Sequence, residues 1–548
     1  MNNKMMMRFK RFIACGLALA ACAVAQPSAG EEKGPFEPTW ESLSRKVTPQ
    51  WFCDAKFGIW AHWGPPCVTA TGGWNARDMY LAGRPQWKHF RKRYGHQSEL
   101  GFKDVLPLFK AEKWDPERLV RIYKEMGAQY VVVLGNHHDN FDLWDSKYQP
   151  WNSVNMGPKR DILAGWAAAC RKEGLPFGIS FHGDHAYMFY EGSQSSDRKG
   201  PRKGVPYDGV MTKADGKGKW WEGLDPQDLY EQHGHKPATV RNPGLIHQYW
   251  HWGKDAPKPP AAVMERFYKR TIDALDKYQP DIACFDLTQV PFWPISDVGL
   301  KIAAHYYNAS AARNGGVPQV VMSGKILPED RRRAITWDVE RGAPDCILKE
   351  PWLSSTCIGD WFYNPEFCRK NSYRSAAHVI RLLADIVSKN GSMLLSIPLR
   401  AEGTFDEKEM AIIDGIGKWM KTNGEAIRGT RPWTVFGEGP SVGKTVEMRG
   451  QGFNEDAMAK GGQGEVRFTR KGDVVYAILL DGRTAERTVL RSFAKGGSLV
   501  PGEIASVEWL GGGAAAFTRD AEGLKVERGD VADASMPAVL KITLAARR

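Results

Sequence analysis

The sequence predicts an α/β protein with a (β/α)8-like TIM-type barrel, followed by a C-terminal antiparallel β-sandwich. First, short apolar runs alternate with amphipathic helical stretches from residue 57 to about residue 425. Second, polar residues follow many of these runs, at the strand ends where barrel enzymes hold their active sites. Third, from residue 431 the pattern changes to strands separated by turns, without a convincing helix.

The chain has 548 residues, which is too long for one compact core, so we expect several domains. We predict a leader at 1–30, the catalytic barrel at 31–430 and the sandwich at 431–548. A polar, glycine-rich stretch around 187–258 is predicted to be an insertion in the barrel, and insertions of this length are often functional.

Residues 1–30 have the pattern of an export signal. A basic start precedes an apolar run at 12–25, and small residues before Gln26 form a possible cleavage site. Leu19–Cys22 (LAAC) also matches a lipobox, in which case Cys22 would carry a lipid anchor. Both possibilities predict a periplasmic, outer-membrane lipoprotein or extracellular location. No later apolar run is long enough for a membrane-spanning helix.

The formal net charge is +12, but the basic residues are dispersed along the chain. No basic helix or nucleic-acid motif accompanies them, so we expect no nucleic-acid partner. A solvated basic surface is the simpler interpretation.

The elements of the barrel are predicted from apolar periodicity and capping signals. Short, fully apolar runs are typical of strands buried on both faces, and we expect such strands at 57–61, 130–134, 177–181, 282–285, 320–322, 334–337 and 393–397. Amphipathic stretches predict helices at 114–127, 162–173, 261–278, 297–314, 372–389 and 407–422. Asp115 and Pro116 begin the first of these helices, and Gly174 ends the second. In the sandwich, we expect strands at 474–480, 488–490 and 540–544.

Polar side chains at successive strand ends form a candidate active site. Asp286 directly follows the apolar run 282–285, and a carboxylate there lies at the C-terminal rim of a barrel. The other strand ends carry His62, His137, His138, the region from His182 to His185, Lys325, and Asp338 with Glu340. One such residue would more often be structural, but the whole set favours an active site.

Two kinds of chemistry could use this set. His62, His137, His138 and Asp139 could bind a divalent metal, although adjacent histidines on an extended strand point to opposite faces and would need a bend. In glycoside hydrolysis, one carboxylate is the nucleophile, a second is the acid/base, and neutral groups hold sugar hydroxyls. The 21 Trp and 13 His residues favour the second reading, with no metal and no cofactor.

Several motifs resemble those of the family-29 glycoside hydrolases, the α-L-fucosidases. The matching stretches, in the order of that family, are 57–64 (FGIWAHWG), 136–144 (NHHDNFDLW), 151–152 (WN), 160–161 (RD), Asp286, 351–352 (PW), 357–364 (CIGDWFYN), 384–395 (ADIVSKNGSMLL) and 423–427 (NGEAI). The resemblance implies a retaining exo-α-L-fucosidase that acts on fucosylated glycans, with a catalytic barrel and a C-terminal β-sandwich.

The resemblance also implies roles for individual residues. Asp286 matches the nucleophile of the family, and histidines such as His62 match residues that hold sugar hydroxyls. The predicted substrate-binding set is His62, Trp63, Trp74, His137, His138, His182, Lys325 and Trp361.

Three positions differ from the pattern of the family. Gly73 stands where a Glu is common, Leu353 stands where many members carry the acid, and Lys325 replaces an Arg. We therefore predict Glu340 as the acid/base, because it resembles a subgroup with Glu-Arg-Gly at this place, with Glu350 in reserve. The differences keep two alternatives open: an α-L-galactosidase or related α-L-glycosidase, and a degenerate non-catalytic sugar-binding protein. The histidine set keeps a third open, a metal-dependent hydrolase.

Overall fold

The computed structural model describes residues 34–233, 251–253, 256–286, 288–455, 464–482, 486–529, 533 and 535–545. The predicted leader and its possible lipid anchor at Cys22 lie outside the described residues. Among the described residues, no helix has the length and apolar character needed to cross a membrane.

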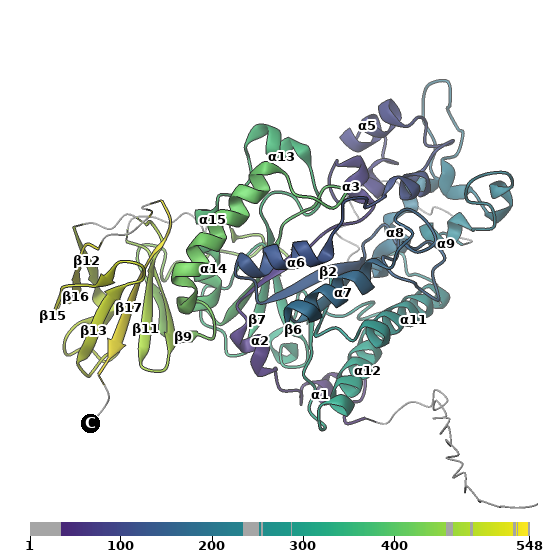
Figure 1. The fold of residues 1–548 in the computed structure, drawn as a ribbon. Helices are drawn as coiled ribbons and strands as arrows, with labels where there is room; N and C mark the ends of the chain where they lie inside the picture. Colours follow the sequence, from purple (N-terminus) through teal and green to yellow (C-terminus); the bar gives the residue numbers. More distant parts are fainter. Residues whose placement is uncertain are drawn as a thin grey trace, which may run out of the picture. The chain divides into compact units, whose positions relative to one another are not determined.

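Eight parallel strands form a closed barrel, which confirms the predicted fold class (Figure 1). The strands are β1 (Phe57–Ala61), β2 (Tyr130–Asn136), β3 (Phe177–Phe181), β4 (Ile282–Phe285), β5 (Val321–Gly324), β6 (Thr336–Glu340), β7 (Trp352–Cys357) and β8 (Gly391–Ser396). Each strand pairs with the next along the chain, and β8 pairs with β1 to close the barrel. Strand β7 was not predicted, because its middle residues are Ser and Thr rather than an apolar run.

Helices follow most of the strands and cover the outside of the barrel (Figure 1), whereas β6 leads to β7 without a helix in the described residues between them. The longer ones are α6 (Pro116–Glu125), α7 (Ile162–Glu173), α11 (Ala261–Tyr278), α12 (Val298–Arg313), α14 (Ala376–Ser388) and α15 (Glu407–Asn423). The capping signals act as predicted: the Asp115 side chain accepts a hydrogen bond from the Arg118 amide, and Gly174 ends α7 with a left-handed φ of 69°.

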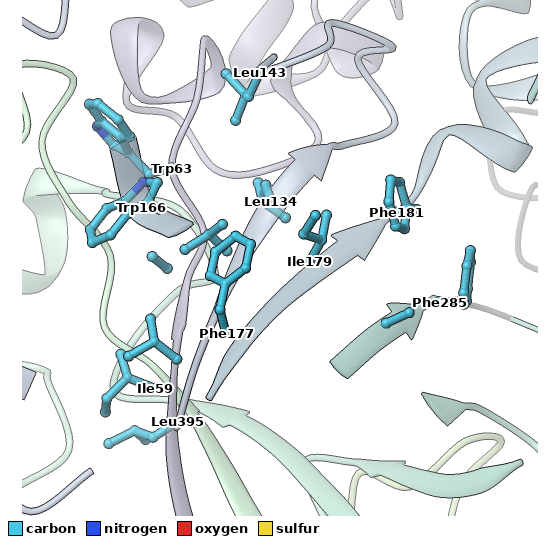
Figure 2. Packing of buried hydrophobic residues seen from close by; sticks show 14 of the residues in the cluster. Ile59, Trp63, Leu134, Leu143, Trp166, Phe177, Ile179, Phe181, Phe285 and Leu395 are labelled. Carbon is cyan, nitrogen blue, oxygen red and sulfur yellow. The ribbon is translucent and has the colours of Figure 1, made fainter. Parts of the chain in front are cut away.

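Strand residues alternate between the inside and the outside of the barrel. On β1, Ile59 packs in the large apolar cluster beneath the helices, whereas Trp60 packs in a smaller cluster with Ile282 and Leu353. Figure 2 shows part of the larger cluster, including Ile59. Because side chains alternate along a strand, every second residue faces the barrel interior.

The C-terminal region forms two antiparallel sheets, as predicted. The strands are β9 (Arg431–Glu438), β10 (Val466–Lys471), β11 (Val474–Leu479), β12 (Arg487–Leu490), β13 (Ile504–Trp509), β14 (Gly513–Ala514), β15 (Phe517–Asp520), β16 (Gly523–Glu527) and β17 (Ala538–Leu544). The six-stranded sheet has the order β14-β13-β17-β11-β10-β9, and the three-stranded sheet has the order β12-β16-β15. Apolar side chains from both sheets, such as Phe468 and Leu524, share one core.

Candidate active site

A cavity of about 390 Å³ opens at the C-terminal ends of the barrel strands. Its volume lies in the range of pockets that hold small-molecule ligands. The cavity is lined by Trp60, His62, Trp74, His137, His138, His182, His251, Asp286, Lys325, Ile326, Glu340, Trp361, Arg449, Gly450, Gln451 and Phe453. The structure therefore brings together both predicted catalytic residues and every predicted substrate-binding residue except Trp63.

Strand alternation explains why these side chains meet. Asp286 lies two residues after Cys284, which faces the barrel interior, so its carboxylate continues the inward-facing row. His62 stands in the same relation to the inward-facing Trp60, and Lys325 lies four residues after the inward-facing Val321. Their side chains therefore converge above the apolar cluster that fills the lower barrel.

One buried ammonium group links the acidic residues of the site. Lys325 Nζ lies 2.9 Å from Glu340 Oε2, 3.3 Å from Asp286 Oδ1 and 3.3 Å from Asp338 Oδ2. The first two distances place Asp286 Oδ1 and Glu340 Oε2 no farther apart than their sum, 6.2 Å. Lys325 thus bridges the carboxyl groups of Asp286 and Glu340.

The two carboxyl groups have different acidities. Burial raises the pKa of Asp286, but the Lys325 ammonium outweighs it, the adjacent His138 and His182 rings add to the effect, and this pKa is held well below the ordinary value. Burial raises the pKa of Glu340 to about 7. Lys325 lowers this pKa, but the nearby Asp286 carboxylate offsets part of that lowering. At neutral pH, Asp286 is therefore ionised while Glu340 can carry a proton, which is the division of roles that acid/base catalysis uses.

Several histidines surround Asp286. His138 donates from Nδ1 to the His182 carbonyl at 2.8 Å, which turns its Nε2 toward Asp286 Oδ2 at 3.7 Å. His182 Nδ1 lies 3.4 Å from the same oxygen. His62 Nδ1 lies 3.1 Å from the Ser396 hydroxyl. Burial lowers the pKa values of His62, His137 and His182, so these rings are neutral and can donate or accept hydrogen bonds.

Three of these imidazoles could also hold a metal. Ligand atoms of His137, His138 and His182 lie within 4.8 Å of one another. This set differs from the predicted one, because it contains His182 and lacks both His62 and Asp139. The Asp139 carboxylate accepts a hydrogen bond from the Phe141 amide instead. Asp286, whose Oδ2 lies beside His138 and His182, already faces the Lys325 ammonium, and that positive charge opposes a dication at the same place.

A buried ion pair supports the histidine-bearing loop after β2. Arg270 of α11 contacts both oxygens of Asp142, at 2.5 and 3.0 Å. Asp142 in turn accepts a hydrogen bond from the Asn136 side chain, whose Oδ1 accepts one from the His182 backbone amide at 3.2 Å. This network fixes the ends of β2 and β3, from which the site histidines project.

The prediction that Trp63 contacts the substrate is corrected by its position. Its ring packs in the large outer cluster (Figure 2), stacked at 5.6 Å on Trp114, and its indole nitrogen donates to the Arg400 carbonyl. Trp63 follows the inward-facing His62 directly, so alternation points it away from the barrel interior.

The structure also shows what surrounds Leu353 and Gly73, which differ from the family pattern, and the reserve acid Glu350. Leu353 lies inside the lower barrel, with 1% of its surface exposed. A β-carbon at Gly73 would lie 2.8 Å from the Phe362 ring, so this ring occupies the space of a side chain there. Glu350 precedes β7 at the opposite, N-terminal end of the strands and lines a different pocket, which removes it as a reserve acid.

Sequence reasoning missed two parts of the cavity wall. His251 comes from the predicted insertion, and the adjacent Trp252 stacks on His185 at 4.7 Å. The segment 449–453 belongs to the region predicted to be a separate sandwich, yet it lines the cavity beside Glu340. Its one sequence signal is the pair of glycines that flank Gln451.

Comparisons with known proteins agree with this geometry. A family model described as alpha-L-fucosidase matches residues 23–425. The chain is 25% identical over 459 residues to an alpha-L-fucosidase of Branchiostoma floridae, covering 81% of this chain and 82% of that protein. It is 25% identical to the human plasma alpha-L-fucosidase, over 73% of each chain. The crystal structure of the Thermotoga maritima alpha-fucosidase is similar, with a TM-score of 0.63 and 25% identity over 92% of this chain and 99% of that one.

Proposed function

The chain belongs to the α-L-fucosidases, family 29 of the glycoside hydrolases, and from this we propose that it is a retaining exo-α-L-fucosidase acting on terminal α-L-fucose of glycans. We further propose that it belongs to the subgroup with Glu-Arg-Gly, here residues 340–342, and that it is exported by its leader.

The spacing of the two carboxylates is the observation that carries the retaining mechanism. Retaining glycosidases hold their carboxyl groups about 5–5.5 Å apart, whereas inverting enzymes need about 6.5–9.5 Å to admit a water molecule. The shared contacts with Lys325 keep Asp286 Oδ1 and Glu340 Oε2 within 6.2 Å. This limit on one pair of oxygens fits the short spacing of retaining enzymes.

In the first step, the Asp286 carboxylate attacks the anomeric carbon of fucose. The bond to the glycosidic oxygen breaks, and Glu340 gives its proton to that oxygen as the leaving group departs. In the second step, the ionised Glu340 takes a proton from water, whose oxygen attacks the anomeric carbon and releases Asp286. Lys325 contacts both groups, so it stabilises the charge on Asp286 before the first step and the charge on Glu340 in the covalent intermediate.

Hydrolysis of aryl α-L-fucoside and aryl α-L-galactoside, each with and without a chelator, tests the proposal. We expect turnover of the fucoside that the chelator does not change. L-Galactose differs from L-fucose by a hydroxyl at C6, so preference for the galactoside would establish the alternative glycosidase. Chelator-sensitive turnover would favour a metal-dependent hydrolase. Binding of fucose without turnover of either substrate would favour a sugar-binding protein.

Removing a site histidine should weaken transition-state binding. We expect His138→Ala to lower kcat/KM for the aryl fucoside by about 30-fold, which corresponds to about 2 kcal/mol for a lost buried hydrogen bond. His305→Ala, on the outer helix α12, serves as the control because His305 lies outside the cavity. Equal kcat/KM values for His138→Ala and the wild type would contradict this role, as would bound zinc whose removal abolishes activity.

The pH dependence of kcat/KM should reflect the raised pKa of Glu340 and the lowered pKa of Asp286. Because Glu340 must hold its proton to act as the acid, and its pKa is raised to about 7, kcat/KM should fall as the pH rises through about 7. Because the pKa of Asp286 is held well below its ordinary value, activity should persist at pH values below Glu340's pKa. The pH dependence of kcat/KM for a fucosyl disaccharide checks this expectation, and Glu340→Gln should remove the alkaline fall. A profile that stays flat through pH 9 would contradict it.

A further inference from the structure

One wall of the cavity comes from a segment far along the chain, residues 449–455, which we call the strap. It follows β9 in the sequence, beyond the last barrel helix α15. Arg449, Gly450, Gln451 and Phe453 of the strap line the cavity together with the barrel residues. The proposed chemistry so far uses none of them.

The strap is held against the end of β6 by its backbone. The Glu340 amide donates to the Gln451 carbonyl at 3.0 Å, and the Phe453 amide donates to the Glu340 carbonyl at 2.8 Å. Gly452 lies between these bonds with a φ of 157°, and a β-carbon there would come within 1.9 Å of the Glu340 carbonyl oxygen. Only glycine permits this close approach. The strap therefore has a fixed position relative to the proposed acid.

The side chain of Gln451 determines which oxygen of Glu340 can deliver a proton. Gln451 Nε2 donates to Glu340 Oε2, the same oxygen that Lys325 Nζ contacts at 2.9 Å. In the described part of the chain, no hydrogen bond reaches Glu340 Oε1. Two donors on Oε2 keep that oxygen an acceptor, so the proton of the acid resides on Oε1. The oxygen of the leaving group must therefore approach Oε1, in the cavity that Glu340 and the strap line together.

Phe453 has two properties that an ordinary loop residue lacks. It exposes 47% of its surface at the cavity, although large apolar side chains gain by burial. Its backbone is in the left-handed region, with a φ of 59°, which is unfavourable for a bulky residue. Such backbone outliers concentrate at functional sites. An exposed aromatic ring offers a flat apolar surface that suits the C–H face of a pyranose.

We propose that the strap forms the subsite for the leaving group, with Phe453 as the platform for the sugar ring to which fucose is attached. This inference rests on the proposed fucosidase activity and defines its substrate class as a fucosylated saccharide whose penultimate sugar stacks on Phe453. Gln451 acts as a positioning residue, because it orients Glu340 toward that sugar.

The test compares Phe453→Ala and Phe453→Tyr with the wild type on two kinds of substrate. The first is a panel of fucosyl-galactose disaccharides, of which the best-cleaved linkage is used. The second is α-L-fucosyl fluoride, whose leaving group is too small to reach a platform. We expect Phe453→Ala to lower kcat/KM for the disaccharide about tenfold. For the fluoride, its kcat/KM should stay within about twofold of the wild-type value. Phe453→Tyr, which keeps the ring, should behave like the wild type.

The fluoride substrate separates the possible failures. If Phe453→Ala loses activity equally on both substrates, the residue has a structural role and the subsite is rejected. If it loses activity on neither substrate, the subsite is also rejected, while the fucosidase activity stands. If the wild type cleaves neither the fluoride nor any disaccharide, the proposed function itself fails.

Discussion

Asp286→Ala is expected to lower kcat for an aryl α-L-fucoside by about 10⁴-fold or more, the largest effect of any single substitution in this protein. Asp286 is the ionised carboxylate at the centre of the cavity, with Lys325, His138 and His182 around it. Without it, no group on that face of the sugar can form the covalent intermediate. Steady-state kinetics of the purified variant measures the loss, and Asp330→Ala, which removes an exposed carboxylate elsewhere, is the control.

Chemical rescue shows whether the loss arises from a missing nucleophile. Azide fits the space vacated by the carboxylate and should restore part of the activity by attacking the anomeric carbon directly. One displacement inverts the configuration, so the product should be β-L-fucosyl azide. Near-normal activity of Asp286→Ala without azide would contradict the assignment.

Glu340→Gln is expected to produce the second-largest loss, and one that depends on the leaving group. General acid catalysis contributes about 10²–10⁴-fold, so kcat/KM for a fucosyl disaccharide should fall by about 10³-fold. For an aryl fucoside whose phenolate departs easily, kcat/KM should fall by about tenfold or less. This quantity reports the step up to departure of the leaving group, which isolates the role of the acid.

Glu350→Gln is the matched control for this prediction. It is the same substitution in a residue at the other end of the barrel strands, and we expect normal kcat/KM on both substrates. A selective loss in Glu350→Gln alone would contradict the assignment of Glu340. Uniform losses on both substrates in Glu340→Gln would show a role in binding or folding rather than in proton transfer.

Much of the fold could be predicted because local patterns determine it. Fully apolar runs such as Tyr130–Leu134 and capped helices such as α7 carry their signals in neighbouring residues of the sequence. Strand β7 could not be recognised in this way. Its residues Ser354, Ser355 and Thr356 are buried polar residues, and their hydroxyl and amide groups pair with partners that are remote in sequence, such as Gly342, Asp338 and Glu455.

The sequence predicted those site residues whose positions follow from the ends of the barrel strands. Asp286 and Lys325 each end a recognisable strand, so their convergence follows from the barrel topology. Trp63 shows the limit of counting residues near a strand end, because a shift of one position reverses the direction of a side chain. Gln451 and Phe453 could not be predicted, because backbone pairing across more than one hundred residues brings them to Glu340.

A single labelling experiment tests the central claim, that this chain forms a covalent fucosyl-enzyme on Asp286. A 2-deoxy-2-fluoro-α-L-fucosyl fluoride reacts through its good leaving group, while the 2-fluorine slows hydrolysis of the intermediate. Peptide mapping by mass spectrometry should find one label per chain, on Asp286, and no label in Asp286→Ala. A label on another carboxylate, or an unlabelled protein that nonetheless hydrolyses aryl α-L-fucosides with inversion, would contradict the account.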